Sequence, residues 1–202
     1  MSLMLDNPPS PAARSRVTAD ELLAMPNAKN FELVNGELVE RIMGWESECL
    51  GMNVSALLWN YCREHACGWV NGSSAGYQCY EEAFPDDPDR VRKPDVSFIA
   101  ADRISAETDL RGHCELVPDL AVEVISPNDR YHEVEDKVDE YLRVGVRLVW
   151  VVDPKKKTIR IHRANGTIQD LRVGDELSGE EVIPGFRCPV SEVFRLPLNV
   201  KP

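Results

Sequence analysis

A strand, helix, strand pattern over residues 120–152 constrains the fold of this chain more than any other feature. Leu120–Ile125 is apolar apart from one carboxylate, and such runs are typical of strands covered on both faces. Residues 131–144 have helical periodicity, and Gly145 is well placed to cap that helix before the apolar run Arg147–Val152. The pattern predicts a strand, helix, strand unit with Leu120–Ile125 as the central strand of a sheet.

Further elements are predicted on both sides of this unit. Asn35-Gly36 lies between two β-prone runs and is a strong hairpin signal. We expect a short helix over 18–26, a hairpin over 31–40, a long helix over 46–65, one or two strands within 68–82, a strand over 91–99 interrupted by Pro94, a hairpin partner over 158–162, and short β segments that end near residue 194.

The composition fits one globular domain. The chain has 202 residues, of which 43% are hydrophobic and 28% charged, as in ordinary globular proteins. Residues 1–16 contain three prolines among small polar residues, so we expect a disordered tail ahead of a single domain over 17–202. No apolar run reaches the roughly 18 residues that span a bilayer, and the N-terminal stretch lacks the apolar region of a signal peptide. We therefore expect a soluble cytoplasmic protein without a membrane segment.

The net charge and the cysteine spacing limit the classes of function that the chain can have. The 34 acidic and 23 basic residues give a net charge of −11, which excludes a globally basic nucleic-acid coat protein. The six cysteines have neither CxxC nor paired Cys/His spacing, so we expect free thiols rather than a zinc site. Basic clusters over 90–93 and 155–163 could contact phosphates, or they could be solvated surface that balances the acids.

Two carboxylates are candidate site residues. Glu123 interrupts the central apolar run, and a buried ionised carboxylate without partners costs several kcal/mol. It must therefore be paired, protonated or bound to a cation. Asp95 follows Pro94 in the preceding strand, and two acids on neighbouring strands could together bind Mg²⁺. The alternatives are an ion pair with an arginine for Glu123 and an ordinary turn for Pro94-Asp95.

Lys137 is the third candidate. With about 100° per residue, Val134, Val138, Tyr141 and Leu142 form an apolar stripe on the helix over 131–144. Lys137 lies on the flank of this stripe, about 60° from Val134. The remaining charged residues are expected on the far side: Glu135, Asp136, Asp139, Glu140 and Arg143. The alternative is a lysine whose stem covers apolar surface while its ammonium reaches water.

These residues carry a resemblance to a known family. The chain contains, in order, Pro94-Asp95, Glu123-Val-Ile-Ser-Pro127, Lys137, Tyr141, Gly145-Val146 and Trp150-Val-Val-Asp-Pro154. In this combination it resembles the Uma-type family of restriction endonucleases, within the PD-(D/E)xK nuclease superfamily. The similarity extends from the Phe31–Leu38 hairpin to the Pro184-Gly-Phe186 and Val190–Phe194 tail.

The resemblance implies a fold, an activity and a site. The expected fold is a restriction-endonuclease-like core of the α/β class, a mixed sheet with flanking helices and an N-terminal β-hairpin. The expected activity is metal-dependent hydrolysis of DNA phosphodiester bonds by a homodimer. Asp95 and Glu123 match the two acids that bind Mg²⁺ or Mn²⁺. Ile125 replaces the superfamily's usual lysine, and Lys137 matches the position where this family places it.

Two further positions bear on the resemblance. Ser47 stands where relatives often carry a histidine. Glu32 matches a frequent family acid, but it could equally be an exposed hairpin carboxylate or a cross-strand partner. Two other functions stay open from the sequence: a catalytically degenerate nuclease fold that acts as a dimeric binding module, and a metal-dependent hydrolase of a small phosphate ester.

Overall fold

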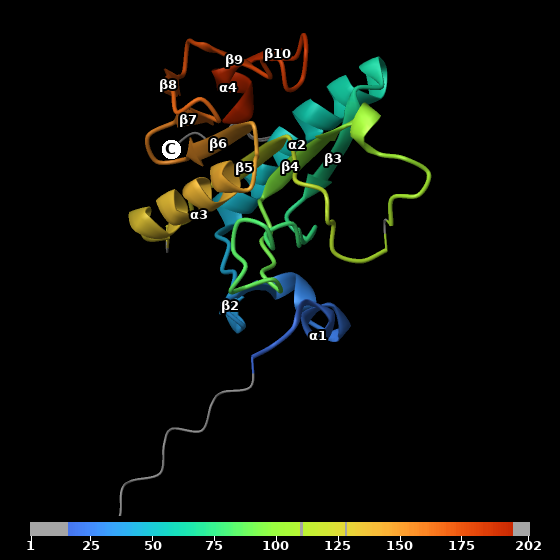
Figure 1. Cartoon of the computed structure of the whole chain (residues 1–202). Coiled ribbons are helices and arrows are strands. Elements are labelled where there is room, and N and C mark those ends of the chain that lie inside the picture. Colours follow the sequence, from blue (N-terminus) through green and yellow to red (C-terminus); the bar gives the residue numbers. More distant parts are fainter. Residues whose placement is uncertain (1–15, 110, 128, 196–202) are drawn as a thin grey trace, which may run out of the picture.

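The computed structural model describes residues 16–109, 111–127 and 129–195 (Figure 1). Its centre is a six-stranded sheet in the order β3-β4-β5-β6-β7-β8, in which β5 and β6 are parallel and the other neighbours antiparallel. The strands are β3 Gly68–Gly72, β4 Val96–Ala100, β5 Leu120–Val124, β6 Leu148–Asp153, β7 Thr158–Arg163 and β8 Ile168–Arg172. The predicted mixed sheet is confirmed, and β5 is an interior strand of it.

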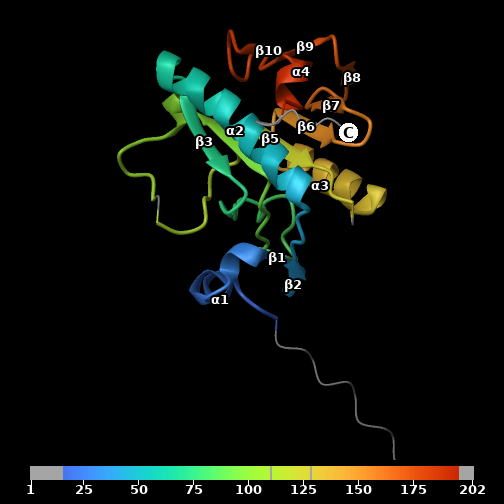
Figure 2. The same ribbon diagram turned by 180° about the vertical axis from the view of Figure 1, so that it is seen from behind.

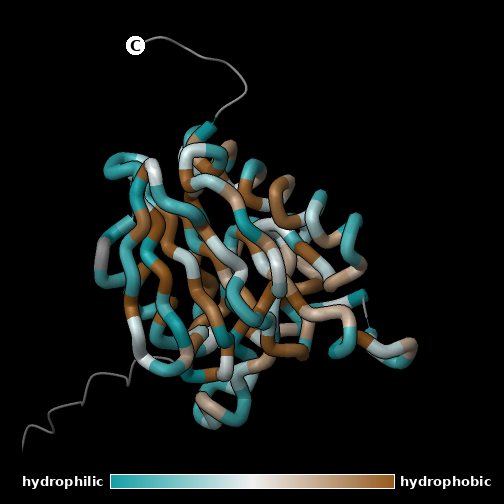
Figure 3. The backbone as a smooth tube through the Cα atoms, turned by 90° about the horizontal axis from the view of Figure 1, so that it is seen from above, coloured by the Kyte–Doolittle hydropathy of each residue, from teal (hydrophilic) through white to brown (hydrophobic). Residues whose placement is uncertain are grey.

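Two long helices cover the two faces of this sheet (Figures 1 and 2). They are α2 (Trp45–His65) and α3 (Tyr131–Arg143). Successive side chains of β5 point to opposite faces of the sheet, so both faces are apolar and each is covered by a helix. Val122 packs in one apolar cluster with α2, whereas Ala121 packs in another with α3. The hydrophobic segments in Figure 3 accordingly gather in the sheet and on the inner sides of the helices.

Smaller elements close the ends of the sandwich. The hairpin turn Asn35-Gly36 has φ values of 54° and 74°, and two positive φ angles are what a two-residue hairpin requires. The small elements are α1 Ala19–Ala24, η1 Ala28–Asn30, β1 Phe31–Val34, β2 Glu37–Glu40, η2 Ala101–Arg103, β9 Glu176–Ser178, β10 Arg187–Pro189 and α4 Val190–Val193. The predicted hairpin and first helix are confirmed, including the capping box of Thr18 and Glu21.

The structure corrects one strand prediction. The strand expected over 91–99 begins only at Val96, because Pro94 cannot donate to a ladder and Val91 bridges instead to Leu33 of the hairpin. Within 68–82, where one or two strands are expected, the structure has one, Gly68–Gly72. Residues 1–15 of the predicted tail lie outside the described residues, and Arg16 donates to the carbonyl of Asp86 at 3.1 Å.

Two other expectations bear on the described residues. All six cysteines are free thiols, as expected from their spacing. Among the helices that the structure describes, none combines the length and the apolar character needed to cross a membrane.

Candidate active site

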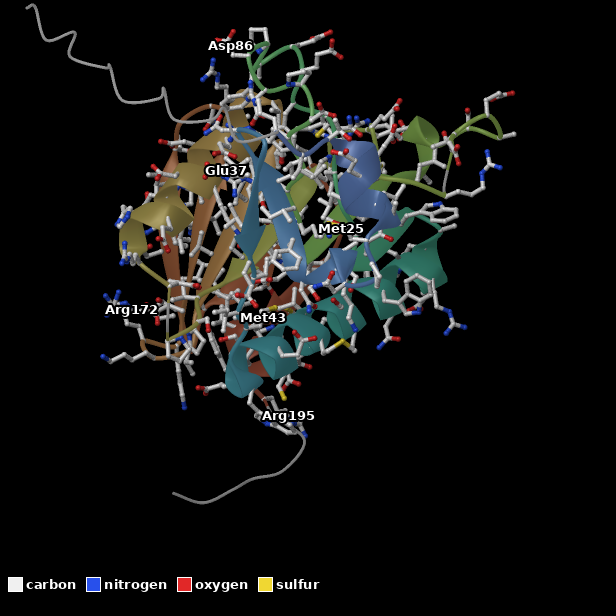
Figure 4. The ribbon with its side chains drawn as sticks, turned by 90° about the horizontal axis from the view of Figure 1, so that it is seen from below. Met25, Glu37, Met43, Asp86, Arg172 and Arg195 are labelled. Carbon is white, nitrogen blue, oxygen red and sulfur yellow. The ribbon has the colours of Figure 1, made fainter. Side chains whose placement is uncertain are left out.

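A cleft of about 640 Å³ opens beside the carboxyl end of β5. Its lining comes from the β1–β2 hairpin, the segment before α2, the region around β4 and β5, and α3. Figure 4 shows the hairpin crossing in front of the sheet between α3 and α2, from the labelled Glu37 toward Met43. The three residues expected from the sequence, Asp95, Glu123 and Lys137, all line this cleft.

The two acids lie side by side, with Asp95 immediately before β4 and Glu123 within the neighbouring strand β5. Val96 pairs with Val122, and one more step in the same antiparallel register brings Asp95 opposite Glu123. Asp95 Oδ2 accepts a hydrogen bond from the Val124 N–H at 2.7 Å, which ties the carboxylate to the end of β5. Both carboxylates are buried. The ordinary turn considered for Pro94-Asp95 is therefore not what the structure contains.

Lys137 reaches into the cleft from α3. Its Nζ lies 3.2 Å from Glu123 Oε2 and 3.4 Å from Glu32 Oε1. Burial alone would lower the pKa of Lys137, but the charges of Glu123 and Glu32 outweigh it and raise the pKa above its ordinary value. The ammonium is therefore held protonated between two carboxylates. Tyr141, one turn later, donates to Glu123 Oε1 at 2.6 Å.

Glu32 is a buried member of the same cluster. Its side chain is only 1% exposed, so the alternative of an exposed hairpin carboxylate is wrong. Arg92 donates to its Oε2 at 2.9 Å, and the Lys93 N–H donates to its Oε1 at 2.9 Å. Burial raises the pKa of this carboxyl, but Lys137, Arg92 and Arg41 together bring it down to about 2.

Sequence reasoning missed the ion pairs that the arginines of the site make. Arg41 lies just after β2 and donates to Asp95 Oδ1 at 2.9 Å. Arg92 binds both oxygens of Glu140 at 2.6 and 2.7 Å. No local sequence pattern predicts these pairs, because each joins residues that are 48 or more positions apart in the chain.

Two sequence-based expectations are corrected here. Glu140 was expected on the far side of its helix, but it pairs with Arg90 and Arg92. A helical wheel identifies the side of α3 that packs on the sheet, but α3 also packs against the loop before β4. The basic cluster over 90–93 is not solvated surface, and its Arg92 lines the cleft. Arg90, Arg92 and Lys93 are buried.

The electrostatics of Asp95 differ from those of Glu32. Burial and the nearby charge of Glu123 raise the pKa of Asp95 to about 7, although Arg41 and the Val124 N–H oppose the shift. Two close buried carboxylates repel each other when both are ionised. A cation between them would relieve this repulsion.

The donor set is compatible with a hard divalent cation. Within residues 16–109, 111–127 and 129–195, no three His, Cys, Asp or Glu side chains group so as to hold a metal ion. Mg²⁺, however, is commonly bound by one or two carboxylates together with water and phosphate oxygens. The oxygens of Asp95 and Glu123 each accept one hydrogen bond, and a carboxylate oxygen can accept about two. Acceptor capacity for a metal therefore remains.

Comparisons with known proteins agree with this architecture. The fold is a restriction-endonuclease-like mixed α/β sandwich. The chain matches the model of the Uma2 family, described as "Putative restriction endonuclease", over residues 19–191, and it belongs to this family. A protein of Anabaena variabilis, whose crystal structure is titled as that of a "putative nuclease belonging to DUF820", is similar with a TM-score of 0.72 and 16% sequence identity. The alignment covers 88% of this chain and 97% of that one. The comparison with curated proteins gives no match.

Proposed function

We propose that this chain is a metal-dependent endonuclease that hydrolyses phosphodiester bonds of DNA. The observation that carries the proposal is the convergence of Asp95, Glu123 and Lys137 in one cleft at the end of β5. Membership of the restriction endonuclease family supports the reaction class. A homodimer and a cytoplasmic location, both expected from the sequence, are part of the proposal.

Each of these residues would have a separate role in the reaction. Asp95 and Glu123, with the backbone carbonyl of Val124, would hold one or two Mg²⁺ or Mn²⁺ ions. When bound, such an ion polarises a phosphoryl oxygen and lowers the pKa of a coordinated water. Lys137 is a fixed cation beside Glu123, suited to orient water and to stabilise negative charge on the phosphate. Tyr141 restricts the orientation of Glu123 through its hydroxyl.

Mn²⁺ titration by calorimetry tests the metal site. We expect binding to the wild type and loss of binding in Glu123→Gln and Asp95→Asn. Glu133→Gln is the matched control, because Glu133 lines the same cleft with an exposed side chain. Circular dichroism checks that each variant is folded. Cleavage of a supercoiled plasmid with Mn²⁺ should be lost in the same two variants. Retained cleavage in both would refute the assignment.

A specific observation also favours a second candidate, a catalytically degenerate fold that acts as a dimeric binding module. Arg41 pairs with Asp95 and Lys137 pairs with Glu123, so each proposed metal ligand already has a cationic partner within the protein. Ser47, at the position where relatives often carry a histidine, is buried and donates to the Ile125 carbonyl at 3.0 Å. Absence of Mn²⁺ binding by the folded wild type, with a short duplex present, would favour this candidate.

A further inference from the structure

Helix α2 carries an apolar stripe on the side that faces away from the sheet. Trp45, Met52 and Trp59 are 89%, 62% and 48% exposed. The opposite side of α2 is buried against the sheet through Leu50, Val54, Leu58 and Cys62. Large apolar side chains in line on a helix surface are uncommon on a monomer and mark an interaction site. Figure 2 shows α2 lying across the outside of the molecule.

The spacing of this stripe is self-complementary. Trp45 and Trp59 lie seven residues before and after Met52, that is, two helical turns on either side. If a second copy of α2 packs antiparallel with Met52 at the two-fold axis, Trp45 of each copy meets Trp59 of the other. A two-fold interface requires this property, because the same surface must serve both partners.

The dipoles of α2 fit the same arrangement, because an antiparallel pair places the N-terminal end of each helix on the same side of the axis as the C-terminal end of the other. The first turn carries Glu46 and Glu48, and the last turn carries Arg63 and His65. The acidic first turn of one copy therefore lies on the same side of the axis as the basic last turn of the other, with Glu48 about 6 Å and Arg63 about 16 Å from the axis along the helices.

We propose that this chain forms a two-fold homodimer through α2, with the stripe of Trp45, Met52 and Trp59 as its centre. The inference deepens the homodimer of the proposed function by naming its surface. A stable homodimer buries about 800 Å² or more per partner, and the two tryptophans supply about a third of that area. The rest comes from the flanks of a helix about 30 Å long.

This dimer fixes the spacing of two clefts. Ser126 Oγ accepts from the Gly44 N–H at 3.1 Å, and Ser47 Oγ donates to Ile125 at 3.0 Å, so the start of α2 is tied to the end of β5. Each cleft therefore adjoins one end of the helix pair. With a rise of about 1.5 Å per residue, the levels of Trp45 in the two copies are roughly 20 Å apart along the helices.

Molar mass in solution tests the surface. The full-length wild type should have twice the chain mass of 22.7 kDa by multi-angle light scattering, and a Trp45→Glu, Trp59→Glu double variant should have the chain mass. Trp69→Glu is the matched control, because Trp69 is 46% exposed but lies on edge strand β3, outside the stripe of α2. A monomeric wild type, or a double variant that stays dimeric, would overturn the inference.

Cross-linking locates the axis. In the proposed dimer Met52 faces its own copy, so Met52→Cys should form an intermolecular disulfide with a mild oxidant such as diamide. The matched position is Glu64→Cys, an exposed site near the end of the same helix. Equal cross-linking at both positions, or none above wild type at 52, would contradict the axis. Mn²⁺ titration of the same variants separates the interface from the proposed nuclease, because metal binding needs only one cleft.

Discussion

Arg41 and Lys137 are the residues that join the carboxylates of the cleft. Arg41 lies 2.9 Å from Asp95 and 3.9 Å from Glu32, and Lys137 lies within 3.4 Å of both Glu32 and Glu123. Removing one partner of such a buried network leaves the other charge uncompensated, which costs about 3–5 kcal/mol. The same contacts fix the geometry on which the proposed chemistry depends. Stability and function therefore share these residues.

Glu32→Gln is predicted to destabilise the protein by about 3 kcal/mol at neutral pH, because Arg92 and Lys137 lose their common partner. The pKa of Glu32 is lowered from 4.5 to about 2 in the folded state. Its stabilising contribution is therefore present above about pH 4.5 and disappears as the pH falls toward 2. Urea unfolding at pH 6 and pH 3 should show the difference between wild type and variant shrinking at the lower pH. Glu40→Gln, an exposed change in the same hairpin, should cost less than about 0.5 kcal/mol.

Mn²⁺ affinity is predicted to depend on pH through Asp95. Because its pKa is raised to about 7 by burial and by Glu123, the metal must displace a proton from it at lower pH. Affinity should rise about tenfold per pH unit below pH 7 and level off near pH 8. Calorimetry in buffers of different ionisation enthalpy would measure the released proton. An affinity that does not change between pH 5.5 and 7 would contradict the assignment of Asp95 as a ligand.

The sequence predicted three residues of the cleft, but it did not predict the side chains that pair with them. Glu123 was predicted because a buried charge requires a partner. Lys137 was predicted because the helical wheel places it beside the apolar stripe of its helix. The structure brings both residues together with Asp95. Glu32 and Arg41 carry no such local signal, since their burial depends on the hairpin packing near α3. Only tertiary contact decides whether a hairpin carboxylate is exposed.

At the scale of elements, the sequence predicted those helices and strands whose formation depends on residues close together in the chain. The helix over 131–144, its glycine cap and the two apolar strands are each specified by their own sequence, and α3 ends within one residue of the expectation. The segment 91–95 resembles a strand in composition, but it bridges to the hairpin and to Tyr77 instead of joining the sheet. Such long-range pairing has no counterpart in a short window of sequence.

Gly145→Ala is predicted to destabilise the protein by about 1 kcal/mol. Gly145 follows α3 with a φ of 102°, a conformation that costs an L-residue strain, while an added Cβ would meet no atom within 4 Å. The loss would therefore come from the backbone alone. Gly72→Ala is the matched control, because its site is equally open and its φ is not in the positive region. Thermal unfolding should separate the two variants, and an equal loss in both would contradict the cap.

At the scale of the whole molecule, the distribution of charge decides where a nucleic acid could bind. The chain carries a net charge of −11; in the cluster over 90–93, Arg90 and Arg92 are buried in ion pairs and Lys93 is buried with its ammonium on the Ala28 carbonyl. Lys155, Lys156 and Lys157 remain exposed in the turn between β6 and β7. A groove of about 380 Å³ lined by Lys156 and Arg160 shares Val134 with the cleft. Phosphates bound along this groove would continue toward the proposed active site.

Replacing Lys155, Lys156 and Lys157 by glutamine is predicted to weaken duplex DNA binding by a similar factor for every sequence, because phosphate contacts do not read bases. Each lost contact should reduce the slope of log affinity against log salt by about 0.9, so the triple variant should lose between 2 and about 3. Fluorescence anisotropy over a range of salt concentrations, in a Glu123→Gln background that prevents cleavage, would measure this slope. The matched control replaces Lys29, Arg111 and Arg187, which are exposed and lie outside the β6–β7 turn and the groove. If the control variant loses as much affinity as the triple variant, binding follows net charge rather than the lysines of this turn, and the path of DNA must be sought on another face.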